Sequence, residues 1–174
     1  MVSSKKTMSR QDIPPSIEIL LADLDDTEHA DAVLSLVNTF AIEPVSGGTG
    51  LDKEVLDALI PGLRAHPTTL IFLARQKGIY MGAAICFLGF STFYARPLVN
   101  IHDLTVLAEH RGKGIGRLLL SAVEARAREL GGCKVTLEVR ADNQGARRLY
   151  ASEGFTNSKG SQTPVSYFFL EKHL

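Results

Sequence analysis

The sequence has few of the features that mark disulfide-rich, metal-binding or nucleic-acid-binding proteins. It contains two cysteines, Cys86 and Cys133, and neither lies in a C-x-x-C motif or near a histidine at ligand spacing. This pattern supports neither a disulfide framework nor a zinc site, so we expect no metal in the functional site. Nineteen lysines and arginines balance nineteen aspartates and glutamates, so the basic excess of a nucleic-acid-binding protein is also missing.

Long hydrophobic segments are missing as well. The longest apolar run, from Ile79 to Phe90, is shorter than the roughly 20 residues that a helix needs to cross a bilayer. Residues 1–15 carry basic side chains without the apolar core of a secretory signal, so we expect a flexible tail. Residues 16–174 suffice for one well-filled core. We therefore predict a single domain in the cytoplasm, with no membrane partner and no nucleic-acid partner.

What is present is a regular alternation of strand and helix patterns. Apolar alternation or continuous apolar character predicts strands at residues 17–21, 70–74, 79–90, 98–107 and 133–139, and two more that begin at Phe155 and Val165. Helical spacing predicts helices after Asp25, after Asp52, from Ile115 and after Asp142 or Asn143. Pro61 should kink or split the second helix, and Lys77-Gly78 should turn a hairpin.

One stretch, Leu104 to Leu120, reads LTVLAEHRGKGIGRLLL and joins a strand to a helix through a glycine corner. Glycines at Gly112, Gly114 and Gly116 allow a ligand to approach the backbone closely. The first N–H groups of the following helix have no intrahelical partners and can bind an anion. The side chains of Arg111, Lys113 and Arg117 add positive charge. The stretch has the character of a pyrophosphate-binding corner.

Spacing separates three kinds of phosphate motif. A Walker A loop needs a glycine followed by lysine and then serine or threonine, but Lys113 is followed by Gly114. A dinucleotide fingerprint needs its last glycine at position 117, which is an arginine. What remains is R-x-x-G-x-G from Arg111 to Gly116, which resembles the acetyl-CoA-binding motif of the GNAT superfamily of N-acetyltransferases.

A second motif supports the resemblance. Residues 137–155 read LEVRADNQGARRLYASEGF, which is similar to the second CoA-contacting region of that family, with an N-x-x-A-x-x-x-Y core from Asn143 to Tyr150. The resemblance implies an α/β (α+β) chain with the GNAT fold. Its central sheet would be mixed, mostly antiparallel and twisted, with six to seven strands flanked by about four helices.

The resemblance also implies roles for individual residues. Backbone groups of Leu104, Thr105 and Val106 would pair with the pantetheine arm of acetyl-CoA, and the Val106 N–H would bind the oxyanion. The pyrophosphate would be bound by Arg111, Gly112, Lys113, Gly114, Ile115, Gly116 and Arg117. Asn143 would contact the pantetheine, and Tyr150 would protonate the leaving thiolate. His102 and Asp103 stand where many members carry a glutamate, so either could be the general base.

The acceptor amine is left open by these residues. Residues 87–106 are similar to the corresponding region of diamine and polyamine acetyltransferases, which favours a small amine. Phe40, Phe93 and Tyr94 are candidates for the acceptor pocket, although core packing explains Phe40 equally well. A protein N-terminal or lysine acetyltransferase, a transferase of another acyl group, and a CoA-binding sensor without turnover are the alternatives. The resemblance is also compatible with a homodimer.

Overall fold

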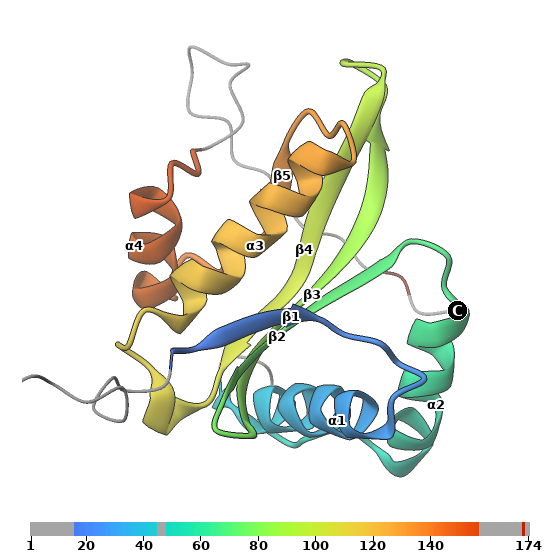
Figure 1. Ribbon diagram of the computed structural model, residues 1–174. Coiled ribbons are helices and arrows are strands. Elements are labelled where there is room, and N and C mark those ends of the chain that lie inside the picture. The colour runs from blue at the N-terminus through green and yellow to red at the C-terminus, as the bar shows by residue number, and fades with distance from the viewer. Residues whose placement is uncertain (1–15, 45–47, 157–171, 173–174) are drawn as a thin grey trace, which may run out of the picture.

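The computed structural model describes residues 16–44, 48–156 and 172, and within them it confirms the alternation of strands and helices (Figure 1). The strands are β1 (Glu18–Leu21), β2 (Thr69–Gln76), β3 (Ile79–Ser91), β4 (Arg96–Val106) and β5 (Val135–Leu137). The helices are α1 (Thr27–Ile42), α2 (Lys53–Ala65), α3 (Ile115–Glu129) and α4 (Gln144–Ser152), with a short 3₁₀ helix, η2, at Ala108–His110.

The described strands form one sheet in the order β1-β2-β3-β4-β5. Neighbouring strands are antiparallel except β4 and β5, which are parallel. This is the mixed, mostly antiparallel sheet that the resemblance implied, although the described residues hold five of the expected six to seven strands. The predicted strand from Val165 lies outside the described residues. Phe155 lies just after α4, where its N–H donates to the Tyr150 carbonyl (2.9 Å).

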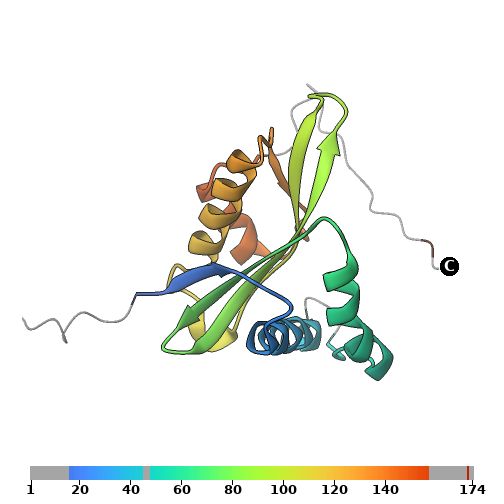
Figure 2. The same cartoon turned by 45° about the vertical axis from the view of Figure 1, so that its right-hand side comes forward.

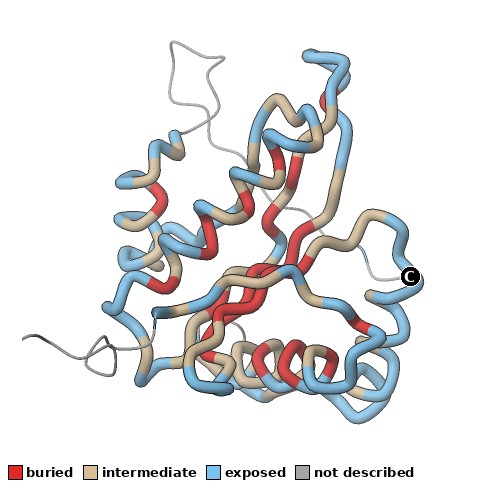
Figure 3. Tube along the Cα trace, viewed as in Figure 1, coloured by how far each residue is buried: buried red, intermediate tan, exposed pale blue. Residues whose placement is uncertain are grey.

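Helices cover both faces of the sheet (Figure 2). Ala84 and Cys86 of β3 belong to the hydrophobic cluster beneath α3 and α4, whereas Ala83 and Ile85 belong to the cluster beneath α1 and α2. Burial of both faces explains the continuous apolar run of β3. Figure 3 shows the buried residues along the middle of the sheet and on the inward sides of α1 and α3. Each fully buried Leu or Ile, such as Leu119, contributes about 1.5–3 kcal/mol.

The N-cap of α1 is Asp26, one residue later than the sequence predicted. Its carboxylate accepts hydrogen bonds from the N–H groups of Glu28 (2.8 Å) and His29 (3.4 Å). Asp25 instead forms an ion pair with Arg64 of α2 (2.9 Å). Two adjacent aspartates are equivalent cap candidates in a sequence, and the contact with α2 distinguishes them.

Two other predictions of local structure were only partly confirmed. Helix α2 runs through Pro61 without being split, and because none of its residues is buried, water can bind the carbonyl that lacks an amide partner. The predicted strand at 133–139 forms β5 only at Val135–Leu137, although the Cys133 N–H donates to the Pro97 carbonyl (2.8 Å) and the Lys134 carbonyl accepts from the Val99 N–H (3.2 Å). Its pairing with β4 ends at Leu137. Within the described ranges, no helix is both long and apolar enough to cross a membrane.

Candidate active site

The candidate site begins where β5 separates from β4. Strand β5 pairs only with the first half of β4, from Val99 opposite Val135 to Ile101 opposite Leu137. The chain then leaves the sheet and reaches α4 at Gln144. In the described part of the chain, β4 therefore has a strand neighbour on one side only beyond Ile101. Unpaired N–H and C=O groups along such an edge can pair with an extended ligand.

A β-bulge marks the point where this open edge starts. The β3–β4 ladder pairs Ile85 with Asp103 and Cys86 with Ile101. His102 is thus an extra residue of β4 between two adjacent pairs. Bulges of this kind bend a strand and redirect side chains, and they are common next to active sites.

The bulge places both candidate bases on the same face of the sheet. Ile101 and Leu104 both pack into the cluster beneath α3, so two residues lie between them where simple alternation allows one. His102 contacts Phe87, which belongs to the cluster on the α1 and α2 side (ring centroids 5.8 Å apart). His102 and Asp103 therefore face α1 and α2, opposite the side that α3 and α4 cover.

Alternation along β4 determines which backbone groups face the gap. The Leu107 N–H donates to the Met81 carbonyl of β3 (2.9 Å). In an antiparallel ladder, every second residue directs its backbone groups to the same neighbour, so those of Thr105 face β3 and those of Leu104 and Val106 face the gap. The side chain of Thr105 is buried. The structure therefore gives Thr105 no group on the open edge, in contrast to its expected contact with the cofactor.

A glycine that the sequence did not single out allows this edge to form. Gly82 of β3 lies opposite Val106. A Cβ at Gly82 would lie 2.7 Å from the Thr105 carbonyl oxygen and 3.2 Å from Cγ2 of Val106. Only glycine fits without moving β4. A glycine inside an otherwise apolar strand was the available signal.

The three glycines of the corner have two different roles. Gly112 and Gly114 have positive φ angles of 75° and 82°, and Gly114 is the N-cap of α3. Gly116 has an ordinary helical backbone, but a Cβ there would lie 2.9 Å from Cδ2 of Leu149, so it allows α4 to pack closely on α3. The side chain of Ile115 is buried in the core, so only its backbone can contact a ligand. Gly112 and Gly114 shape the corner, while Gly116 serves helix packing.

Arg111 connects the corner to α1. Its Nε donates to the Val106 carbonyl (2.9 Å), and its Nη2 donates to the Glu43 carboxylate at the end of α1. The Val106 carbonyl is thereby occupied, which leaves the N–H of Val106 and both backbone groups of Leu104 for a ligand. Arg111 is held by the fold and does not point freely into a phosphate site.

The other two basic side chains also have protein partners. The Lys113 ammonium donates to the Glu109 carbonyl (3.0 Å). The Nε of Arg117 donates to the Glu153 carboxylate (2.6 Å), and its Nη2 to Ser152 (3.2 Å), which ties α3 to α4. The anion-binding capacity of the corner therefore rests mainly on its backbone N–H groups, and Lys113, whose partner is a neutral carbonyl, adds a positive charge.

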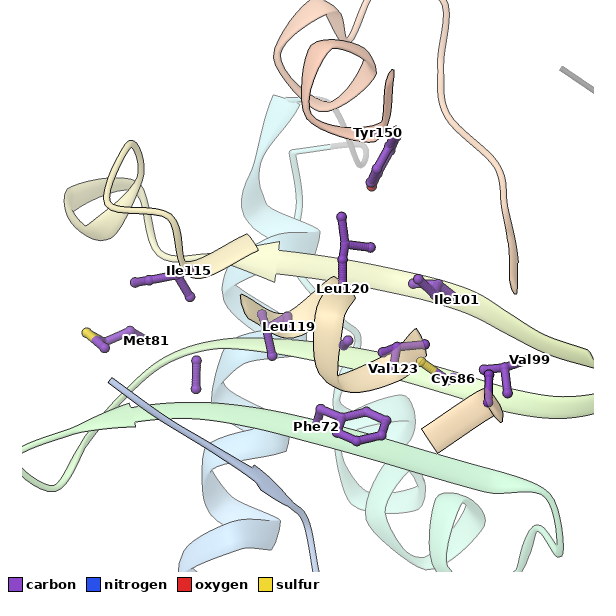
Figure 4. Packing of buried hydrophobic residues seen from close by; sticks show 13 residues of the cluster. Phe72, Met81, Cys86, Val99, Ile101, Ile115, Leu119, Leu120, Val123 and Tyr150 are labelled. Atoms are coloured by element: carbon purple, nitrogen blue, oxygen red, sulfur yellow. The ribbon is translucent and has the colours of Figure 1, made fainter. Parts of the chain in front are cut away.

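Helix α4 carries the two remaining candidate residues. Asn143 is its N-cap, and Oδ1 of Asn143 accepts from the Ala146 N–H (3.1 Å). Tyr150 lies on the inner side of α4, 9% exposed, and Figure 4 shows its ring extending toward Leu120 of α3. Its hydroxyl has no hydrogen-bond partner among the described residues. Burial raises the pKa of this phenol, so the hydroxyl keeps its proton at neutral pH.

Two ionisable groups near the bulge have shifted pKa values. Burial raises the pKa of the Asp103 carboxyl, and the nearby His102 opposes that shift. Burial, with a contribution from Asp103, raises the pKa of the Cys86 thiol to about 12. Cys86 therefore stays protonated and is not a nucleophile. Asp103 becomes a stronger base than an exposed aspartate.

Two of the three aromatic residues predicted for the acceptor pocket lie elsewhere. Phe93 and Tyr94 occupy the turn between β3 and β4, at the far end of the hairpin from the glycine corner (Figure 1). Phe93 is 98% exposed. Leu104 follows Tyr94 by ten residues of a mostly extended strand, or about 30 Å. The prediction that these residues line the acceptor pocket was wrong for a site beside Asp103.

Comparisons with known proteins agree with this architecture. The sequence profile of the acetyltransferase (GNAT) family matches residues 36–155. The chain is 28% identical over 109 residues to the uncharacterized N-acetyltransferase YhfO of Bacillus subtilis, covering 63% of this chain and 73% of YhfO. It is 38% identical over 107 residues to N-alpha-acetyltransferase 40 of Saccharomyces cerevisiae, covering 56% of this chain and 35% of that protein. Its fold is similar to the aminoglycoside acetyltransferase meta-AAC0020 from an uncultured soil metagenomic sample, with a TM-score of 0.69, 19% identity, and 89% and 97% of the two chains covered.

The chain therefore belongs to the acetyltransferase (GNAT) family, as its two motifs predicted. It is an acyltransferase enzyme with N-acetyltransferase activity, and the family uses acetyl-CoA as cosubstrate. The matched residues include the bulge, the glycine corner and α4. Among the described residues, no group of three or more His, Cys, Asp or Glu side chains could hold a metal ion.

Proposed function

We propose that this enzyme transfers the acetyl group of acetyl-CoA to the primary amine of a small molecule by direct attack in a ternary complex. The observation that carries the proposal is the open edge of β4, which starts at the bulge at His102 and ends at Val106, shortly before the glycine corner at Gly112. One end of this edge offers candidate bases and the other offers a backbone anion site. A single extended thioester cofactor can contact both ends.

The cofactor would be bound mainly by backbone groups. The N–H groups from Gly112 to Arg117 would bind the pyrophosphate at the start of α3. The outward groups of Leu104 and Val106 would pair with the pantetheine amides in the manner of an added strand. Because Oδ1 of Asn143 caps α4, the Nδ2 group of Asn143 is the part available to the ligand.

Attack by the amine on the thioester carbonyl creates an oxyanion that needs a donor. The sequence favoured the Val106 N–H, but the Leu104 N–H also faces the gap and lies directly after Asp103. Val106 lies two residues, or about 7 Å, further toward the glycine corner. The thioester must lie within reach of the base, so we favour the Leu104 N–H as the oxyanion donor.

Proton transfer would involve residues on the two sides of the gap. A lysine-like amine has a pKa near about 10 and must lose a proton before or during attack. His102 and Asp103 can accept it, and the raised pKa of Asp103 makes that carboxylate more basic. Tyr150 would protonate the departing CoA thiolate, since its own raised pKa keeps the phenol protonated.

A second candidate acceptor is the α-amine of a peptide. The relative named N-alpha-acetyltransferase 40 is the observation that favours it, with 38% identity over 107 residues. An α-amine has a pKa of about 7.7–8.0 and is partly neutral at physiological pH, so its deprotonation depends less on a general base.

The test measures CoA release with acetyl-CoA and a panel of acceptors: small monoamines, a diamine, a polyamine, an aminoglycoside and short peptides with different N-termini. Turnover of small amines supports the proposal. Turnover of peptides alone would identify the peptide α-amine as the acceptor. Tight acetyl-CoA binding with no turnover on any amine would indicate a CoA-binding sensor and contradict the proposal. Tyr94→Phe at the exposed hairpin turn is the matched control for Tyr150→Phe.

A further inference from the structure

A column of three rings lies on the α1 and α2 side of the sheet. The rings of His102 and Phe87 meet edge to face, with centroids 5.8 Å apart and planes at 72°. Phe87 also meets His66, the C-cap of α2, at 5.0 Å and 72°. The Thr68 hydroxyl lies 3.3 Å from Nδ1 of His66. The column links the end of α2 to the bulge of β4.

The imidazole of His102 depends on this column for its orientation. His102 is an exposed residue of the bulge, opposite no single residue of β3. Among the described residues its ring makes no hydrogen bond, and Phe87 is the ring that it contacts. The edge-to-face contact with Phe87 restricts the rotamers that this exposed imidazole can adopt. Phe87 is half-buried in the cluster beneath α1 and α2, which fixes its own position.

Orientation matters here because proton transfer requires the accepting nitrogen to lie within hydrogen-bond reach of the attacking amine. A displacement of about 1 Å can cost about a hundredfold in rate. The titratable groups that the structure places around the column are Asp103, next to His102 in the chain, and His66 at its far end. Phe87 contacts both imidazoles.

We propose that Phe87 is a positioning residue for His102 and that His66 in turn holds the Phe87 ring. The inference rests on the proposed transfer reaction and takes His102, of the two candidate bases, as the residue that accepts the proton of the attacking amine. Phe87 and His66 contribute no reacting group. They act by limiting the orientations of one imidazole, which then faces the amine.

The test compares Phe87→Leu with Phe90→Leu, a matched control on the same strand whose side chain is 63% exposed. Using an amine that the wild-type enzyme acetylates, we expect Phe87→Leu to lower kcat about ten- to a hundredfold with an unchanged KM for acetyl-CoA. Phe87→Tyr, which keeps the ring, should retain most of the activity. His66→Asn should lower kcat by a smaller factor in the same direction.

A double variant separates positioning from a general loss of structure. In a His102→Asn background, Phe87→Leu should have no further effect on kcat, because the residue that it positions is gone. Equal kcat values for Phe87→Leu and Phe90→Leu, or an undiminished loss in the His102→Asn background, would overturn the inference.

Nuclear magnetic resonance of the histidine C–H protons tests the contact without turnover. The resonances of His102, assigned with His102→Asn, should shift in Phe87→Tyr and His66→Asn and stay in place in Phe90→Leu. Absence of a shift in both variants contradicts the inference even where Phe87→Leu fails to fold. Absence of turnover on every amine in wild type, with the shifts present, contradicts the proposed function and leaves the ring contact intact.

Discussion

Gly82 is the residue whose replacement tests most directly how the cofactor edge is built. In Gly82→Ala the new Cβ would lie 2.7 Å from the Thr105 carbonyl oxygen, against the 3.4 Å of an ordinary contact. The atom that it meets belongs to the backbone, so it cannot rotate away. Strand β4 must move away from β3 by about 0.7 Å at Thr105, which lies between the two residues whose backbone groups face the cofactor.

The size of the effect follows from this displacement. Overpacking of this kind costs about 1–3 kcal/mol, which corresponds to a fall in Tm of about 2–12 °C for a chain of this length. The displaced segment carries the backbone groups of Leu104 and Val106. Weakening one hydrogen bond worth about 0.5–1.5 kcal/mol raises the KM for acetyl-CoA about two- to tenfold.

Gly89→Ala is the matched control for Gly82→Ala. It places the same methyl group on the same strand, where its nearest neighbour is Cδ1 of Leu98 at 3.1 Å, the movable end of a side chain. Thermal unfolding and steady-state kinetics at varied acetyl-CoA measure both variants. If Gly82→Ala and Gly89→Ala have the same Tm and the same KM for acetyl-CoA, then Gly82 is not required for the close approach of β3 to β4, and the reasoning is refuted.

Three further substitutions, one of them with a matched control, test other parts of the site. Tyr150→Phe should lower kcat about a hundredfold with little change in Tm, since the hydroxyl has no partner among the described residues; an unchanged kcat would remove Tyr150 from the mechanism. Gly114→Ala and its control Gly131→Ala place a methyl group at similar positive φ angles (82° and 71°) with no described atom within 4 Å. Both variants should lose about 1–2 kcal/mol of unfolding free energy. Only Gly114→Ala should raise the KM for acetyl-CoA. Asp103→Asn should lower kcat and raise Tm at neutral pH, because a carboxyl whose pKa is raised in the fold destabilises it once ionised. That gain in Tm should vanish as the pH falls below the ordinary carboxyl pKa of about 3.9, and a gain that persists there would refute its electrostatic origin.

The glycine corner shows how far a sequence reading reaches in this protein. Gly112 and Gly114 could be recognised because a positive φ is a property of one residue and its immediate neighbours. Gly116 stands in the same motif, but its role comes from Leu149 of α4. The motif shows all three as equivalent, and only the packing of α4 on α3 separates them.

The basic residues of the corner illustrate the same limit. Counting charges predicted that Arg111 and Arg117 attract phosphate. In the fold Arg111 pairs with Glu43, 68 residues away in the chain, and Arg117 with Glu153, 36 residues away. No local pattern encodes such distant partners. An arginine that already forms an ion pair with a carboxylate is less available to bind a phosphate.

The sequence by itself determined the family, the order of strands and helices, and the corner from Arg111 to Gly116, because periodicity and turn chemistry act within a few residues. Only the tertiary structure decided that β4 is bulged at His102, that Gly82 must lack a side chain because the Thr105 carbonyl lies next to it, and that Phe93 and Tyr94 lie far from the site. These features depend on how β3, β4 and β5 are registered against one another. Register is set by contacts between strands, which the order of residues along one strand does not contain.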